Sequence, residues 1–160
     1  MIRELNKATQ EVNKSHSVVS LTLTQAALIF KKCMVIDEEE FMKVTNVAQG
    51  SAAVIKAYLS SLGSFVGSLT LAKNEAIRST HLDLKQILIE GFQVKNVRLA
   101  VTFVCRIIKE SHQSRVFTHR NPWIHTLLGI LSEIYKYLFT KTGNTDHLME
   151  IESLFRAMQV

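Results

Sequence analysis

Residues 97–108 read VRLAVTFVCRII, and this stretch decides the fold class. Its core-forming apolar residues follow one another in steps of three and four: Val97, Ala100, Val101, Val104, Ile107 and Ile108. Such steps place side chains on one face of an α-helix, whereas a half-buried strand alternates every second residue. The stretch therefore predicts an amphipathic helix with one face in a hydrophobic core.

The same spacing recurs along most of the chain. It appears at 23–34, 41–48, 54–69, 84–92, 124–138 and 148–158. In the third of these, the predicted core stripe is made of Val54, Tyr58, Leu62, Phe65, Val66 and Leu69. No comparable stretch alternates with period two, so we expect an all-α chain. The first fifteen or so residues are polar and are expected to be either a helix or a loosely held arm.

The positions at which the predicted helices begin indicate a repeat. Starts near residues 51 and 97 lie about 46 apart, and starts near 83 and 122 lie about 40 apart, within the period of about 40–47 residues of HEAT-type repeats. This favours a single helical-repeat domain over residues 1–160, an α-solenoid of stacked antiparallel helix pairs, over a closed four-helix bundle. Such stacks present extended surfaces and typically bind other proteins.

Local signals agree with these helices. Asp37 is a predicted N-cap for one helix, and Thr80 or Asp83 for another. Asn121-Pro122 is the clearest start, because asparagine caps and proline suits the first helical position. The GxxxG spacing of Gly63 and Gly67 predicts close packing against another helix.

Composition narrows the class of protein. The chain has 160 residues, 47% hydrophobic and 21% charged, which is typical of one globular domain. Its net charge of +5 permits contact with nucleic acid or an acidic partner but requires neither.

Cys33 and Cys105 are too few for a disulfide scaffold and are expected to be reduced core thiols of an intracellular protein. No uninterrupted apolar run approaches the length of a membrane span, so no membrane association is expected.

The sequence lacks the motifs that carry chemistry. It has no phosphate-binding glycine loop, no metal-binding HExxH or CxxC and no GxSxG nucleophile turn. The consecutive Glu38, Glu39 and Glu40 point to different helix faces and do not form a catalytic carboxylate pair. We therefore expect no enzyme activity, no cofactor and no metal site.

The most basic window lies at residues 95–120. It holds six Lys or Arg residues against one acid, Glu110. Arg106, Lys109 and Arg115 are the candidates for contact with RNA or an acidic partner. The alternative is an ordinary solvated helix face.

Residues 62–77 read LGSFVGSLTLAKNEAI, and are followed by LDLK at 82–85 and NPW at 121–123. Together these motifs resemble the family of the large scaffold subunit of the Ccr–Not mRNA deadenylase complex. The similarity is to its central domain, which is itself similar to the middle domain of eukaryotic initiation factor 4 gamma. It covers residues from about 50 to 160.

The resemblance implies a non-catalytic scaffold built from HEAT-like helix pairs. The family domain has more pairs than fit here, so we expect either a fragment or an N-terminally shortened version. The implied partners are a DEDD-type deadenylase nuclease and a DEAD-box RNA helicase, in mRNA decay and translational repression. The implied setting is the cytoplasm, as a monomeric domain within a larger complex.

By the same resemblance, the helicase would contact the turn after the third stripe. The matching residues are Lys73, Asn74, Ile77, Arg78, Ser79, Thr80 and Asp83. The alternative for Lys73 and Asn74 is that they only close the preceding helix, with asparagine at its C-terminal position. The alternative function is a helical-repeat RNA-binding module that uses the basic 95–120 window.

Overall fold

The structure of the chain is a computed structural model that describes residues 2–35, 51–93, 97–141 and 145–159. Within these ranges it leaves the side chains of 8–17, 34–35, 51–53 and 145–146 undescribed. The helix predicted at 41–48 and its cap Asp37 therefore lie outside the described residues.

The described part of the chain is built from helices joined by loops and contains no strand. They are α1 (Ile2–Val35), α3 (Ser51–Leu69), α4 (Leu84–Gln93), α5 (Val97–Lys109), α6 (Pro122–Lys141) and α7 (Thr145–Ala157). Two short 3-10 helices, η1 (Leu71–Lys73) and η2 (Glu110–Gln113), follow α3 and α5. The all-α prediction is confirmed.

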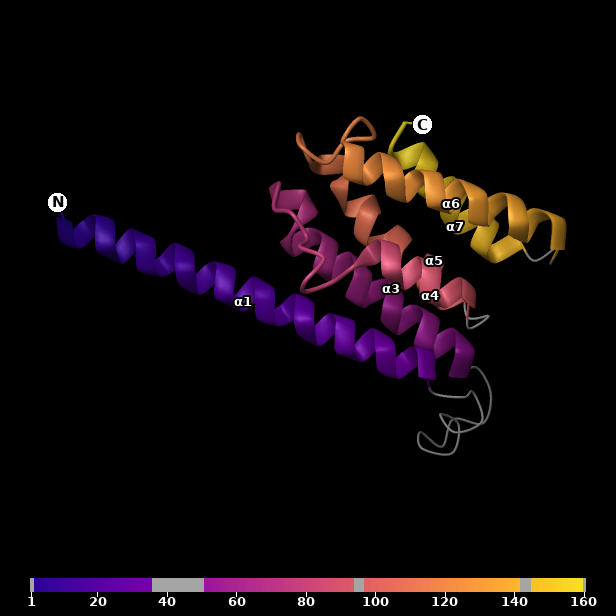
Figure 1. Cartoon of the computed structure of the whole chain (residues 1–160), viewed down its shortest axis with the longest axis horizontal. Coiled ribbons are helices and arrows are strands. Elements are labelled where there is room, and N and C mark those ends of the chain that lie inside the picture. Colours follow the sequence, from indigo (N-terminus) through magenta and orange to yellow (C-terminus); the bar gives the residue numbers. More distant parts are fainter. Residues whose placement is uncertain (1, 36–50, 94–96, 142–144, 160) are drawn as a thin grey trace.

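These helices form a stack of antiparallel pairs (Figure 1). Helices α1, α4 and α6 run in one direction, and α3, α5 and α7 return in the other. Within the returning row α3 packs on α5 and α5 on α7, while α1, α4 and α6 pack against α3, α5 and α7 respectively. Helices that begin near residues 51 and 97 thus lie side by side, as the repeat spacing predicts. This arrangement is an α-solenoid, and the predicted fold is confirmed.

Helix α5 lies at the centre of the stack. Its residues from Ala100 to Cys105 are all buried, so the helix is covered on nearly every side and not only on the predicted face. Phe103 stacks on Phe30 of α1 with ring centroids 4.8 Å apart, which ties α1 to the core. The N-terminal half of α1 extends beyond the rest of the molecule (Figure 1). Of the two alternatives for the first residues, the helix is the one observed.

The prediction for the core face of α3 was wrong at three positions. Val54, Tyr58 and Phe65 are 50%, 50% and 53% exposed, while Ile55, Leu59 and Val66 are buried. The glycines explain the difference. Gly63 and Gly67 face α5, and at 100° per residue Val54 and Phe65 lie on the opposite side of the helix. Phe92, predicted in the core face of α4, is also 44% exposed.

Close packing at the GxxxG spacing is confirmed. A Cβ atom on Gly63 would lie 2.8 Å from the carbonyl oxygen of Phe103, and one on Gly67 2.6 Å from that of Ile107. Both distances are far below van der Waals contact, so any side chain at either position would push the two helices apart. The absence of side chains lets the backbones of α3 and α5 approach.

The stretch Val54–Lys73 has the length and mean hydropathy (1.3) of a membrane-spanning helix, although Lys56 and several Ser and Gly residues interrupt its apolar sequence. In this fold it comprises most of α3 together with η1, with 39% of the stretch buried inside the protein. Its apolar character therefore has an explanation in packing against α1 and α5.

Candidate functional site

The loops that follow α3 and α5 lie at the same end of the stack (Figure 1). They carry η1 and η2, which contact each other. Most of the residues predicted to contact a partner belong to the first of these loops, residues 70–83. We refer to residues 70–83 and 110–121 together as the loop end.

Asn74 joins the two loops. Its backbone has φ 61°, the left-handed region that asparagine tolerates better than most residues, and it caps η1. Its side-chain Oδ1 accepts hydrogen bonds from the hydroxyl of Ser114 at 2.8 Å and from the backbone N–H of Arg115 at 2.9 Å. Asn74 therefore closes η1 rather than α3, which ends at Leu69, and it adds a longer-range tie between the loops.

Ser114 completes this junction from the other loop. It is buried, and its hydroxyl oxygen accepts hydrogen bonds from the backbone N–H groups of Val116 at 3.1 Å and Phe117 at 2.9 Å. The same hydroxyl donates to Asn74, so one side chain organises its own loop and fastens it to the other. Sequence reasoning missed Ser114. The available signal was a serine that opens a turn between two helices.

The predicted partner residues of the first loop divide into two groups. Ile77 is 6% exposed and belongs to the hydrophobic core, so its side chain offers no surface to a partner. The others are exposed: Lys73, Asn74, Arg78, Ser79, Thr80 and Asp83. Asp83 also caps α4, because its Oδ1 accepts the backbone N–H of Gln86 at 3.2 Å, as predicted. A single exposed loop thus presents six of the seven residues.

A groove opens between this loop and α1. It has a volume of about 490 Å³. From the loop, Ser79, Thr80 and Asp83 line it, and α1 contributes Phe30 and Lys31. A third wall comes from the first turns of α4.

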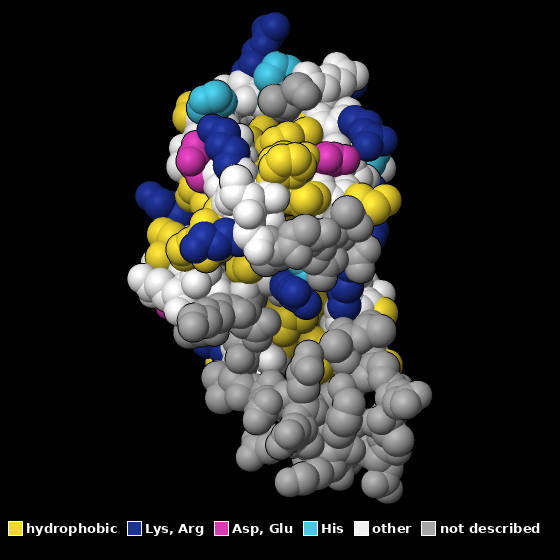
Figure 2. All heavy atoms as spheres, turned by 90° about the vertical axis from the view of Figure 1, so that its right-hand side faces the viewer, with side chains coloured by type: hydrophobic (Ala, Val, Ile, Leu, Met, Phe, Trp, Pro, Cys, Tyr) yellow, Lys and Arg dark blue, Asp and Glu magenta, His cyan; other side chains and the backbone are white. Residues whose placement is uncertain are grey.

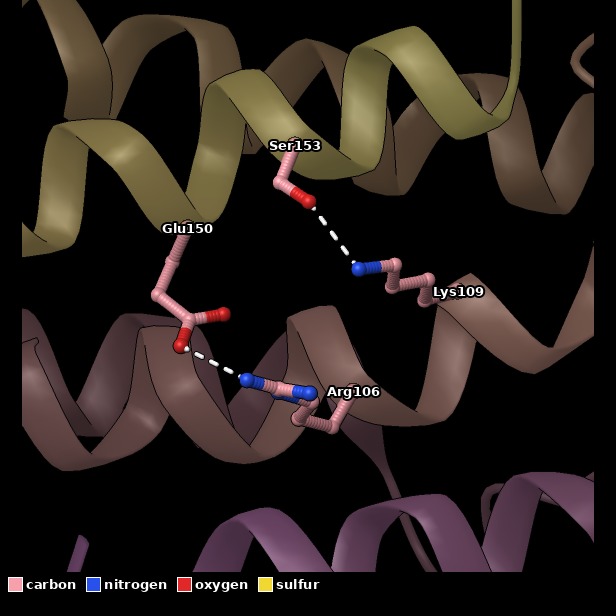
Figure 3. Close-up of polar contacts among 4 residues, drawn as sticks. All are labelled: Arg106, Lys109, Glu150 and Ser153. Atoms are coloured by element: carbon pink, nitrogen blue, oxygen red, sulfur yellow. Dashed lines mark hydrogen bonds and ion pairs between the residues drawn. The ribbon is translucent and has the colours of Figure 1, made fainter.

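Arg106 and Lys109 face α7 rather than open solvent (Figure 3). An Arg106 guanidinium nitrogen lies 3.2 Å from the Glu150 carboxylate, with the two side chains 36% and 16% exposed. The Lys109 ammonium donates to the Ser153 hydroxyl at 3.0 Å. Both residues therefore fasten α5 to α7. Arg115, the third candidate, lies at the loop end with an exposed side chain.

The loop end also begins α6 as predicted. Asn121 Oδ1 accepts the backbone N–H of Trp123 at 3.0 Å and of Ile124 at 3.4 Å, and Pro122 is the first residue of the helix. Trp123 lies edge-on to Phe117 with centroids 6.0 Å apart, packed against the core.

Three titratable side chains outside the loop end have a raised pKa. The Tyr135 hydroxyl donates to the Glu152 carboxylate at 2.7 Å, and this hydrogen bond is the main cause that raises the pKa of Tyr135. Burial raises the pKa of the Cys105 thiol, and more weakly that of Cys33. Neither thiol is poised as a nucleophile, because only the thiolate is reactive.

The described residues contain no group of three or more His, Cys, Asp or Glu side chains placed to hold a metal ion.

Figure 2 views the end of the stack opposite the loop end. Hydrophobic side chains gather there at the height of α6 and α7, with basic and acidic side chains around them. The large exposed hydrophobic residues of these two helices are Tyr137, Phe139 and Met149. The loop end is polar and charged by comparison, so the two ends of the stack offer different chemistry.

Comparison with known proteins gives a family match over nearly the whole chain. Residues 8–160 match the family described as the CCR4-NOT transcription complex subunit 1 CAF1-binding domain. The match begins well before residue 50, where the sequence resemblance was expected to begin.

Individual relatives agree with this match. The chain is 31% identical over 94 residues to general negative regulator of transcription subunit 1 of Schizosaccharomyces pombe, covering 59% of this chain and 4% of that protein. It is 29% identical over 108 residues to the protein of the same name in Saccharomyces cerevisiae, covering 68% of this chain and 5% of that protein. A third relative is CCR4-NOT transcription complex subunit let-711 of Caenorhabditis elegans, 33% identical over 79 residues, 48% of this chain and 3% of that protein. The chain spans only a small part of the length of these relatives.

Proposed function

The chain belongs to the family of CAF1-binding domains of CCR4-NOT transcription complex subunit 1, and we propose from this that it is a non-catalytic scaffold domain that binds a CAF1 deadenylase. The single observation that carries the proposal is the family match over residues 8–160. In this proposal the deadenylase is a DEDD-type nuclease and the setting is cytoplasmic mRNA decay and translational repression.

The architecture supports a binding role. The helices form an elongated stack, and stacks of this kind present extended surfaces to partners. Three side-chain hydrogen bonds each join one element to another. They link Asn74 to Ser114, Arg106 to Glu150, and Tyr135 to Glu152. These contacts hold neighbouring elements of the stack together.

A capture assay tests the proposal. The chain is immobilised, incubated with purified CAF1 deadenylase, washed and given a polyadenylated RNA. We expect poly(A) shortening on the resin only when chain and deadenylase are both present, and none with the chain alone. Failure to retain the deadenylase would contradict the proposed binding, and shortening by the chain alone would contradict the scaffold role.

Docking of a DEAD-box RNA helicase on the first loop remains part of the proposal. Its support is the sequence resemblance together with the exposure of Lys73, Arg78, Ser79, Thr80 and Asp83. Arg78→Glu is the suitable test variant, because Arg78 is exposed. Asn74→Ala is not, because it also breaks the junction with Ser114. We expect Arg78→Glu to weaken retention of the helicase and to leave retention of the deadenylase unchanged.

The alternative, an RNA-binding module, has less support from the same residues. Arg106 and Lys109 already contact Glu150 and Ser153, which leaves Arg115 as the exposed candidate. RNA affinity measured at several salt concentrations tests it, since each phosphate contact adds to the slope of affinity against salt. A steep slope that Arg115→Ala reduces would favour this alternative.

A further inference from the structure

We propose that the groove between α1 and α4 binds a segment of a partner protein in which a Lys or Arg lies beside an apolar side chain. The groove is the 490 Å³ space described above. This proposal is independent of deadenylase binding, since it rests only on the chemistry of the groove walls.

The base of the groove is apolar. Phe30 of α1 and Ile87 of α4 line it from opposite sides, and Leu82 lines it from the loop. All three belong to the hydrophobic core, so their positions are fixed by packing. An apolar side chain that enters the groove removes its own surface from water without requiring these residues to rearrange.

The wall formed by α4 is acidic. Asp83 and Glu90 line it, and Gln86 lies between them. The Asp83 carboxylate accepts the backbone N–H of Gln86 at 3.2 Å, and the Glu90 carboxylate accepts the Gln86 side-chain amide at 3.1 Å. These hydrogen bonds orient both carboxylates along one side of the groove.

Neither carboxylate has an ion-pair partner among the described side chains. Other acids of the stack do: Glu133 pairs with Lys136, Glu150 with Arg106, and Glu152 with Arg156. The protein as a whole is basic, at +5, whereas Asp83 and Glu90 make this one wall acidic. The two carboxylates complement a cation on the occupant, because Lys31, which also lines the groove, forms no ion pair with either of them.

The opposite wall carries one cation, the exposed Lys31 of α1. It repels a basic residue placed against α1 and thus favours one that faces α4. The occupant therefore has its Lys or Arg toward Asp83 and Glu90, and its apolar side chain toward Phe30 and Ile87.

Fluorescence anisotropy with the full chain and short labelled peptides tests this. The probes are a peptide that alternates Leu with Arg, one that alternates Leu with Glu, and one that alternates Ser with Arg. We expect saturable binding of the Leu/Arg peptide, weaker binding at higher salt, and much weaker binding of the other two. No binding of the Leu/Arg peptide, or equal binding of either other peptide, would overturn the proposal.

The test variant is Asp83→Asn combined with Glu90→Gln. Asparagine caps a helix as well as aspartate does, and glutamine can still accept from Gln86, so the fold is retained while two charges are removed. Loss of two exposed charge pairs is expected to lower the affinity for the Leu/Arg peptide about two- to tenfold. The matched control is Glu4→Gln combined with Glu133→Gln, which changes the net charge equally at exposed sites outside the groove. Unchanged affinity in the test variant, or an equal loss in the control, would contradict the assignment.

Discussion

The side-chain oxygen of Asn74 accepts a hydrogen bond from the hydroxyl of Ser114, 40 residues further along the chain, at 2.8 Å. This contact fastens the loop after α3 to the loop after α5. Both loops connect one helix pair to the next, so the contact sets how successive pairs sit on each other at the loop end. Asn74 contributes to this contact in two ways: its left-handed backbone turns the chain, and its side chain accepts the hydrogen bond.

Substitution of Asn74 separates these two contributions. Asn74→Gly keeps the left-handed backbone but loses two hydrogen bonds, and is expected to lower the free energy of unfolding by about 1–3 kcal/mol. Asn74→Ala adds left-handed strain of about 1–2 kcal/mol and is expected to be less stable still. Asn74→Asp keeps both features and is the control. Urea denaturation measures all three, and equal stability of the Gly and Ala variants would contradict the role of the backbone.

The glycines of α3 and α6 are expected to respond in opposite ways to alanine. In Gly67→Ala the new methyl group would lie 2.6 Å from the carbonyl oxygen of Ile107. The resulting overpacking costs about 1–3 kcal/mol, which outweighs the gain in helix propensity. A methyl group added at Gly129 would instead meet no atom within 4 Å.

Gly129→Ala is therefore the matched control and is expected to stabilise the protein by about 0.5–1 kcal/mol. Thermal unfolding of the two variants beside the wild type measures both effects. A stabilising Gly67→Ala would show that α3 and α5 are not in close contact.

The ion pair between Arg106 and Glu150 is expected to be coupled more strongly than the surface pair between Lys136 and Glu133. The first pair is 36% and 16% exposed and joins two helices, whereas the second is 68% and 75% exposed within one helix. Double-mutant cycles with glutamine at each position are expected to give a coupling energy of about 0.5–1 kcal/mol for the first pair and less than about 0.5 kcal/mol for the second. Equal coupling energies would mean that the α5–α7 contact is not screened from solvent.

Tyr135 is expected to ionise at a higher pH in the wild type than in a Glu152→Gln variant. Its hydrogen bond to Glu152 raises its pKa in the folded state. The stabilisation is therefore fully present below the unfolded tyrosine pKa of about 10 and is lost as pH rises through the folded value. Titration of tyrosinate absorbance measures this.

In that titration Glu152→Gln is expected to move part of the tyrosinate absorbance to lower pH, with Glu133→Gln as the unchanged control. The difference in thermal midpoint between wild type and Glu152→Gln is expected to shrink above about pH 10. A tyrosinate titration curve that Glu152→Gln leaves unchanged would contradict the contact.

Much of the fold could be predicted from apolar periodicity and from the spacing of helix starts. Both signals depend only on residues that are close together in the sequence, so they can be recognised without knowing how the helices pack. The buried face of α3 could not be predicted in the same way. Val54, Tyr58 and Phe65 form a stripe as regular as the buried one, and only the approach of α5 to Gly63 and Gly67 decides which stripe faces inward.

The candidate site could be predicted in part. The caps Asp83 and Asn121 are local signals and were found. The partner of Asn74 was not, because a hydrogen bond to Ser114 depends on how two loops meet in space. For the same reason the basic window at 95–120 did not reveal that Arg106 and Lys109 are engaged by α7.

Binding of a CAF1 deadenylase is the central claim about this chain. The most direct measurement is an isothermal titration of the chain with purified CAF1 deadenylase, with the destabilising Gly67→Ala and the stabilising Gly129→Ala titrated in parallel. We expect saturable binding by the wild type and by Gly129→Ala, and weaker binding by Gly67→Ala. No heat of binding with a folded wild-type chain would contradict the claim.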